Sequence, residues 1–312
     1  MIKYGVPQGS ILGPLLFLIF INDLPEHTNF YIKLFADDTF LCNQNKDIEK
    51  LQSEVNSELV KVFNWLHANK LTLNISKSKF MLVTNKKNFS RDFSVIINDV
   101  ALEECDKYKY LGVFIDRKLT FKSHIEYICG KISKACGALS KLRHVVSINI
   151  LKDVYYALIH SYLRYGIIVW GNASKAILKP LENLINKALR IMTFAPFGRI
   201  ELEPLYEYLK VLTIKEVFSL ETGKFMYKKT NNLLPISIGD YFESRQQNDS
   251  GYNLRPRKNN LTKPIMYRLT SGERSIQFHG ANLWKTLPNE VKKSESYISF
   301  KRQYKFFLLD SD

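Results

Sequence analysis

The hydrophobic pattern of this 312-residue sequence changes near Leu119, and the change limits the folds open to it. Beyond that residue, apolar side chains recur at steps of three and four in the stretches 125–142, 151–162 and 177–192. Such steps place apolar side chains on one face of an α-helix. Before Leu119, short apolar runs surround a single helical pattern at 48–66. We therefore expect an α+β fold with a mixed N-terminal region and a mainly helical remainder.

The N-terminal region is expected to contain short strands joined by tight turns. Asp47 is suited to cap the helix that follows it, because its carboxylate accepts hydrogen bonds from free backbone N–H groups. Asn98-Asp99 is typical of a turn. The strands are predicted at Tyr31–Ala36, Thr39–Cys42, Phe80–Thr84, Phe93–Ile97 and Tyr108–Ile115. Later in the chain we predict a polar, basic loop at Ser244–Lys263 and a closing helix at Tyr297–Leu309.

The longest apolar run, Ile11–Ile21, predicts a buried helix over Ile11–Leu24 that ends at Pro25. The run is shorter than the roughly 20 residues that a membrane-spanning helix needs. No small-residue cleavage site follows it, so a signal peptide is not expected. The four cysteines are scattered and form no C-x-x-C pair, which favours a reducing compartment. We expect a soluble, intracellular protein without a membrane partner, and both nucleus and cytoplasm remain open.

The net charge points to a class of partner. Lys and Arg number 45 against 30 Asp and Glu, which gives a formal charge of +15. Such an excess attracts polyanions such as nucleic acid. Between Arg117 and Arg143 only Glu126 opposes the basic residues. A basic helix is often a solvated face, and the alternative is contact with nucleic-acid phosphates. The candidates for that contact are Lys131, Lys134, Lys141 and Arg143.

Asp37 and Asp38 lie where the first two predicted strands meet. Two adjacent carboxylates repel each other, and a bound cation relieves this repulsion. Carboxylate oxygens favour Mg²⁺, which keeps coordination positions open for substrate phosphates. An Asp pair in a hairpin is, however, more often an ordinary solvated turn. The six histidines do not combine with Cys or Glu at the spacing of metal ligands.

Two sequence motifs favour a metal site at Asp37 and Asp38 over an ordinary solvated turn. The first is Gly-Val-Pro-Gln-Gly-Ser-Ile-Leu-Gly-Pro-Leu-Leu-Phe at Gly5–Phe17, and the second is Phe-Ala-Asp-Asp-Thr at Phe35–Thr39. Together they resemble motifs B and C of the reverse transcriptases of non-LTR, LINE-type, jockey-like retrotransposons. Less specific similarity continues through Trp65–Met81 and Tyr110–Asp116, and the helical region as far as Trp170 resembles a thumb.

The resemblance implies part of a right-hand polymerase palm, which extends a DNA primer with dNTPs on an RNA template. Asp37 and Asp38 would then be catalytic carboxylates that bind Mg²⁺, for which Mn²⁺ can substitute. The other implied positions are Gln8, Gly9 and Lys77 at the nucleotide and template, and Tyr110, Leu111 and Gly112 in a hairpin that grips the primer.

The first motif begins four residues after Met1. Palms of this family carry a third metal-binding aspartate in motif A, upstream of motif B. We therefore expect an N-terminally truncated palm that is inactive in isolation. The alternative is a catalytically dead remnant that only binds nucleic acid. The expected division is a partial palm at 1–117, a helical thumb-like region at 118–170 and a helical, basic C-terminal region at 171–312, with the oligomeric state left open.

Overall fold

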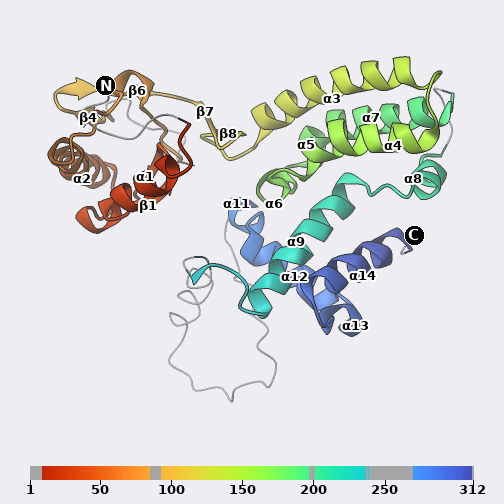
Figure 1. The fold of residues 1–312 in the computed structure, drawn as a ribbon. Coiled ribbons are helices and arrows are strands. Elements are labelled where there is room, and N and C mark those ends of the chain that lie inside the picture. The colour runs from red at the N-terminus through yellow and green to blue at the C-terminus, as the bar shows by residue number, and fades with distance from the viewer. Residues whose placement is uncertain (1–8, 85–92, 197–200, 237, 239–269, 311–312) are drawn as a thin grey trace. The chain divides into compact units, whose positions relative to one another are not determined.

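The computed structural model describes residues 9–84, 93–196, 201–236, 238 and 270–310. The chain forms two compact units, Met1–Tyr108 and Lys109–Asp312, which we call unit 1 and unit 2 (Figure 1). Gln8 and the predicted loop Ser244–Lys263 lie outside the described residues. The mixture of helices and short strands agrees with the predicted α+β class. The finer division of the chain into palm, thumb-like and C-terminal regions stays a prediction.

Unit 1 combines one long helix with short paired strands. Its described helices are α1 (Gly13–Ile21), the 3₁₀ turn η1 (Leu24–His27), α2 (Ile48–Ala68) and the 3₁₀ turn η2 (Ile75–Lys77). Its described strands are β1 (Tyr31–Phe35), β2 (Asp38–Cys42), β3 (Lys79–Phe80), β4 (Ile96–Ile97), β5 (Val100–Ala101) and β6 (Glu103–Glu104). The pairs β1–β2 and β4–β5 are antiparallel, whereas β3–β6 is parallel.

The start of α2 confirms the predicted cap. The Asp47 carboxylate accepts hydrogen bonds from the backbone N–H groups of Glu49 and Lys50, at 3.0 and 3.3 Å. These bonds satisfy donors that have no partner within the helix. The buried core of unit 1 consists of Ile21, Leu24, Phe30, Leu59, Val62, Trp65, Val95 and Ile97.

Helix α1 corrects the expectation of a buried helix. It is shorter than predicted, because Pro14 lies in its first turn and Pro25 belongs to the separate turn η1. Only Gly13 and Ile21 of α1 are buried. Its exposed apolar side chains are Leu15, Leu16, Leu18, Ile19 and Phe20. The apolar run supplies a hydrophobic surface, and the described residues of unit 1 cover only a small part of it.

Unit 2 is largely helical, and a hairpin that starts at the last residues of unit 1 leads into it. The predicted single strand Tyr108–Ile115 is wrong, because the chain turns at Leu111-Gly112 and forms β7 (Lys107–Tyr110) and β8 (Val113–Asp116). The described helices that follow are α3 (Lys122–Leu142), α4 (Ile148–Tyr155), the π-helical turn η3 (Tyr156–His160), α5 (Ser161–Arg164), α6 (Ile167–Trp170), α7 (Lys175–Thr193), α8 (Glu203–Leu209), α9 (Ile214–Thr230), α11 (Thr270–Glu273), α12 (Ile276–Thr286), α13 (Asn289–Lys292) and α14 (Tyr297–Leu309).

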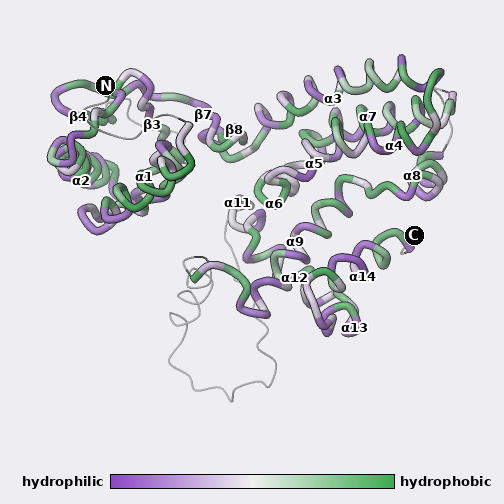
Figure 2. Tube along the Cα trace, in the orientation of Figure 1, coloured by the Kyte–Doolittle hydropathy of each residue, from purple (hydrophilic) through white to green (hydrophobic). Residues whose placement is uncertain are grey.

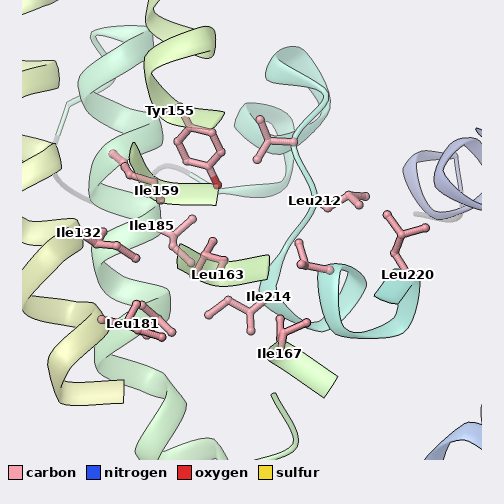
Figure 3. Packing of buried hydrophobic residues seen from close by; sticks show 14 of the residues in the cluster. Ile132, Tyr155, Ile159, Leu163, Ile167, Leu181, Ile185, Leu212, Ile214 and Leu220 are labelled. Carbon is pink, nitrogen blue, oxygen red and sulfur yellow. The ribbon is translucent and has the colours of Figure 1, made fainter. Parts of the chain in front are cut away.

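One hydrophobic core extends through the helices of unit 2. Hydrophobic and hydrophilic segments alternate along α3 and α7, as expected for amphipathic helices (Figure 2). The two helices lie side by side. Figure 3 shows part of the core between them and their neighbours, which includes Ile132, Tyr155, Ile159, Leu163, Leu181 and Ile185. The same core reaches Phe300 and Tyr304 of the predicted closing helix α14, so late segments of the chain complete it.

No helix within the described parts of the chain has both the length and the apolar character needed to span a membrane.

Candidate functional site

The two motif aspartates lie at adjacent but different positions of the β1–β2 hairpin. Phe35 pairs with Asp38, so Ala36 and Asp37 form a two-residue loop and Asp38 is the first residue of β2. Ala36 has a φ of +50°, in the left-handed region that few non-glycine residues adopt. Both aspartates are exposed. The hairpin is confirmed, although its tip lies one residue earlier than the sequence predicted.

The chemistry of these two carboxylates suits a hard cation. Neither Asp37 nor Asp38 forms a salt bridge with another described residue. No cluster of three or more His, Cys, Asp or Glu side chains able to hold a metal occurs in the described ranges. Two oxygen donors leave several positions of a Mg²⁺ ion free for water and substrate phosphates. The chemistry of this donor pair therefore suits a hard divalent cation that takes its other ligands from elsewhere.

Glu58 of α2 holds the segment that leads into this hairpin. One carboxylate oxygen accepts hydrogen bonds from the Thr28 hydroxyl at 2.9 Å and the Asn29 backbone N–H at 2.7 Å. The other accepts from the Asn29 side-chain amide at 2.9 Å and the Lys61 ammonium at 2.6 Å. These bonds, led by that from Lys61, lower the pKa of Glu58 to about 2. The base of β1 is thus fixed to α2 by a charged, nearly buried group.

The other predicted nucleotide-binding residues are placed only in part. Gly9 is exposed and has a φ of +82°, and no atom lies within 4 Å of the position that a Cβ would take. A glycine is favoured there by its backbone conformation. Lys77 is exposed at the end of η2, where its backbone N–H donates to the Asn74 side chain at 3.2 Å. Among the described ion pairs, Lys77 has none with Asp37 or Asp38.

The predicted primer hairpin is attached to the helices of unit 2. Leu111 and Gly112 have φ values of +44° and +83°, and two consecutive positive φ values are typical of a type I′ turn. The Tyr165 hydroxyl donates to the Leu111 carbonyl at 2.5 Å. A Cβ on Gly112 would lie 3.2 Å from the Tyr165 ring. Tyr110 is the half-buried last residue of β7. Sequence reasoning did not single out Tyr165, which fixes the turn.

Asp116 joins this hairpin to α3. Its carboxylate accepts hydrogen bonds from the backbone N–H groups of Thr120 at 3.0 Å and Phe121 at 2.7 Å, and from the Thr120 hydroxyl at 3.1 Å. Phe121, with a φ of +60°, is the residue that precedes α3. Asp116 therefore orders the connection between strand and helix.

The four basic candidates on and beside α3 have different surroundings. Lys134 and Lys141 are exposed. The Lys131 ammonium lies 5.5 Å from the centre of the Tyr127 ring. The Arg143 guanidinium lies 4.0 Å from the centre of the Phe194 ring and is half-buried. Contact with an aromatic face partly satisfies a cation, so Lys134 and Lys141 are the more available pair for phosphate.

Comparison with known proteins bears on these residues. Residues 1–115 match the family described as reverse transcriptase (RNA-dependent DNA polymerase). The chain is 31% identical over 207 residues to the RNA-directed DNA polymerase from mobile element jockey of Drosophila melanogaster. This alignment covers 63% of this chain and 22% of that protein. It is 26% identical over 230 residues to the probable RNA-directed DNA polymerase from transposon X-element of the same species, covering 71% of this chain and 25% of that protein.

The segment that carries the Asp37-Asp38 hairpin lies within the residues that match the reverse transcriptase family. Its similarity to the jockey and X-element polymerases confirms the resemblance to reverse transcriptases of non-LTR retrotransposons. The similarity also extends beyond the matched domain, because the alignment with the X-element polymerase covers 71% of the chain. The chain spans about a quarter of the length of these relatives.

Proposed function

We propose that this chain acts as part of an RNA-directed DNA polymerase of a non-LTR retrotransposon. The observation that carries the proposal is the exposed Asp37-Asp38 pair on a two-residue hairpin, within the segment that matches reverse transcriptases. In this proposal the hairpin contributes two of the carboxylates that hold Mg²⁺, or Mn²⁺ in its place. Bound metal would lower the pKa of the primer 3′-hydroxyl and neutralise charge on the leaving pyrophosphate.

The remaining residues bind and position the substrates in this proposal. Gln8, Gly9 and Lys77 lie beside the incoming dNTP and the template base. The second hairpin contacts the DNA primer through Tyr110, Leu111 and Gly112. Its attachment to Tyr165 supports this role, because a fixed turn loses less conformational freedom when the primer binds. The basic residues of α3 hold the phosphates of the RNA template and its primer.

A second function is supported by a different observation. Lys134 and Lys141 are exposed on α3, and the chain carries a formal charge of +15. These charges support nucleic-acid binding whether or not a metal is held. The second candidate is therefore a binding protein without catalysis, and metal binding distinguishes the two.

The experiment is a titration of the 312-residue chain with Mn²⁺ in the presence of an RNA–DNA primer–template, followed by NMR. We expect paramagnetic broadening of the amide signals from Ala36 to Thr39. The double variant Asp37→Asn/Asp38→Asn should lose this broadening. Asp47→Asn is the matched control, because asparagine also caps a helix. Primer–template binding without broadening in the wild-type chain would overturn the catalytic proposal and favour the second function.

A further inference from the structure

A cavity of about 300 Å³ lies beside the β7–β8 hairpin, within unit 2. We call it the hairpin pocket. Its floor contains the buried residues His124 and Ile128 of α3, and Gly112 of the hairpin turn also lines it. A volume of this order is at the lower limit for small-molecule sites, which run from about 300 to 1,000 Å³. The pocket is therefore suited to one flat ring rather than to a base pair.

A π-helical turn lies next to the residues that complete the lining of the hairpin pocket. The π-helical turn Tyr156–His160 ends where α5 begins. Ser161 and Tyr162 of α5 line the pocket, and so does Tyr165, which directly follows α5. A π turn adds a residue to the helical turn and so rotates the side chains that follow. Such turns occur frequently at functional sites. The tyrosines give this side an aromatic surface.

His124 contributes a neutral, almost fully buried ring to the lining of the pocket. The side chain is 2% exposed, and its Nδ1 accepts a hydrogen bond from the Phe114 backbone N–H at 3.4 Å. Burial, with a smaller effect of the Lys109 charge, lowers the pKa of His124 to about 4, so the ring is neutral at pH 7. The proton of a neutral ring whose Nδ1 accepts a bond lies on Nε2. Nε2 has no hydrogen-bond partner among the described residues.

The entrance of the hairpin pocket carries a positive charge. Lys109 is exposed and lines the pocket. Its ammonium lies 4.9 Å from the centre of the Tyr127 ring, which also lines it. The pocket thus combines aromatic walls with a cation at its opening. A nucleobase has matching features, because its flat ring stacks on aromatic side chains and is linked to a phosphate.

We propose that the hairpin pocket receives one unpaired nucleobase of the nucleic acid bound to this chain. The base lies against the tyrosine rings, and its phosphate lies near Lys109. The inference rests on the proposed nucleic-acid binding and adds a base-binding site to it. Duplex nucleic acid would not fill the pocket, because its bases are paired and stacked.

The experiment is photo-crosslinking of the 312-residue chain to a short single-stranded RNA that contains one 4-thiouridine, with the crosslinked residue identified by mass spectrometry. We expect crosslinks to Tyr127, Tyr162 or Tyr165. Ser161→Trp places a large ring at the entrance and should lower the yield about 10-fold, in line with the loss of one base–aromatic contact. Ser140→Trp, at an exposed position of α3, is the matched control. The same uridine in an RNA–DNA duplex should give only background crosslinking.

Circular dichroism verifies the fold of each variant, and fluorescence anisotropy measures total RNA affinity. Normal RNA affinity with crosslinks outside the pocket, or an unchanged yield in Ser161→Trp, would overturn the pocket and leave the proposed function standing. Absence of any RNA binding would overturn both.

Discussion

The two units use their apolar residues in different ways. In unit 2, Ile132 and Leu181 are fully buried in a core shared by many helices. In unit 1, Leu15 and Ile19 of α1 are 54% and 66% exposed, although they belong to the longest apolar run of the chain. An apolar sequence stabilises a fold only where a second surface covers it. Hydrophobicity alone therefore predicted the helices of unit 2 better than the environment of α1.

The units also differ in how their candidate functional segments are held. In unit 1, the carboxylate of Glu58 holds the segment that precedes the β1–β2 hairpin. In unit 2, the Tyr165 ring and hydroxyl hold the second hairpin against a packed helix. Activity and stability should consequently respond to different substitutions in the two units. The following predictions test this separation.

The largest effect is expected for Asp37→Asn in a fusion protein in which the upstream part of the jockey polymerase precedes this chain. In the proposed site, the Asp37 charge faces a divalent ion, and its loss should remove several kcal/mol of transition-state stabilisation. Primer extension on an RNA template should fall by at least about 1,000-fold, while thermal unfolding stays unchanged because Asp37 is exposed. Asp38→Asn should leave a residual rate that Mn²⁺ raises.

Asp47→Asn in the same fusion protein is the control for primer extension and should behave as the parent. Equal losses in Asp37→Asn and Asp38→Asn would contradict the expectation that the loop and strand positions are not equivalent. Full activity in both variants would show that the pair is an ordinary turn.

The second prediction compares two leucines. Leu181→Ala leaves a cavity in the core of unit 2 and should lower the free energy of unfolding by about 2–5 kcal/mol. Leu15→Ala in α1 should change it by less than about 0.5 kcal/mol, because its side chain is already exposed to water. Urea denaturation followed by circular dichroism measures both. Comparable losses would mean that α1 is as well covered as the helices of unit 2.

The third prediction concerns Glu58→Gln in unit 1. We expect a loss of about 1.5–3 kcal/mol at pH 7, the usual contribution of hydrogen bonds to a charged group. The folded-state pKa of about 2 lies below the ordinary value of 4.5, so the unfolded chain takes up the proton first on acidification. The extra free energy of unfolding that Glu58 provides over Gln is therefore fully present above pH 4.5, and it disappears as the pH falls towards 2.

Urea denaturation at several pH values measures this advantage, followed through the unit 1 transition if the two units unfold separately. Glu54→Gln is the matched control, because Glu54 is an exposed residue of the same helix. A difference between Glu58→Gln and wild type that persists unchanged at pH 2 would contradict the role of the charge.

The smallest effect is expected on the basic face of α3. Lys134→Ala/Lys141→Ala should reduce the log–log salt slope of nucleic-acid binding by about 0.7–0.9 for each lost phosphate contact. Lys131→Ala/Arg143→Ala should reduce it less, since these cations contact Tyr127 and Phe194. Fluorescence anisotropy with a primer–template at a series of salt concentrations measures the slopes. An unchanged slope in the first pair would make this helix face an ordinary solvated surface.

Much of the local structure was predictable because short-range rules decide it. Asp47 determines the start of α2, Asn98-Asp99 forms the β4–β5 turn, and α14 has the predicted bounds Tyr297–Leu309. Helix α9 was not singled out, because it is buried on several faces, with Thr222 and Lys224 among its buried residues, and so lacks a clear apolar stripe. The Thr213–Glu216 capping box was the available signal for its start.

The sites were predictable only where motifs mark them. The sequence located Asp37 and Asp38 through their motif. It did not reveal Tyr165, because the bond of its hydroxyl joins residues far apart in the chain. It also did not reveal the burial of His124, whose Nε2 has no hydrogen-bond partner among the described residues. The π-helical turn beside the hairpin pocket was not predictable from periodicity, since the apolar pattern of 151–162 continues through it. The contacts of Tyr165 and His124 therefore depend on neighbouring elements of the fold rather than on a local sequence pattern.

The bond from Tyr165 to the Leu111 carbonyl has a consequence for the kinetics of the second hairpin. A two-stranded hairpin alone is only marginally stable in water. This one is attached to α5, and Arg164 of α5 forms an ion pair with Glu221 of α9 at 2.8 Å. Its amide hydrogens should therefore exchange with solvent in the same cooperative opening as those of the helices. The lifetime of the hairpin is then set by the helical core, which lets a small turn remain in place through many encounters with a nucleic-acid strand.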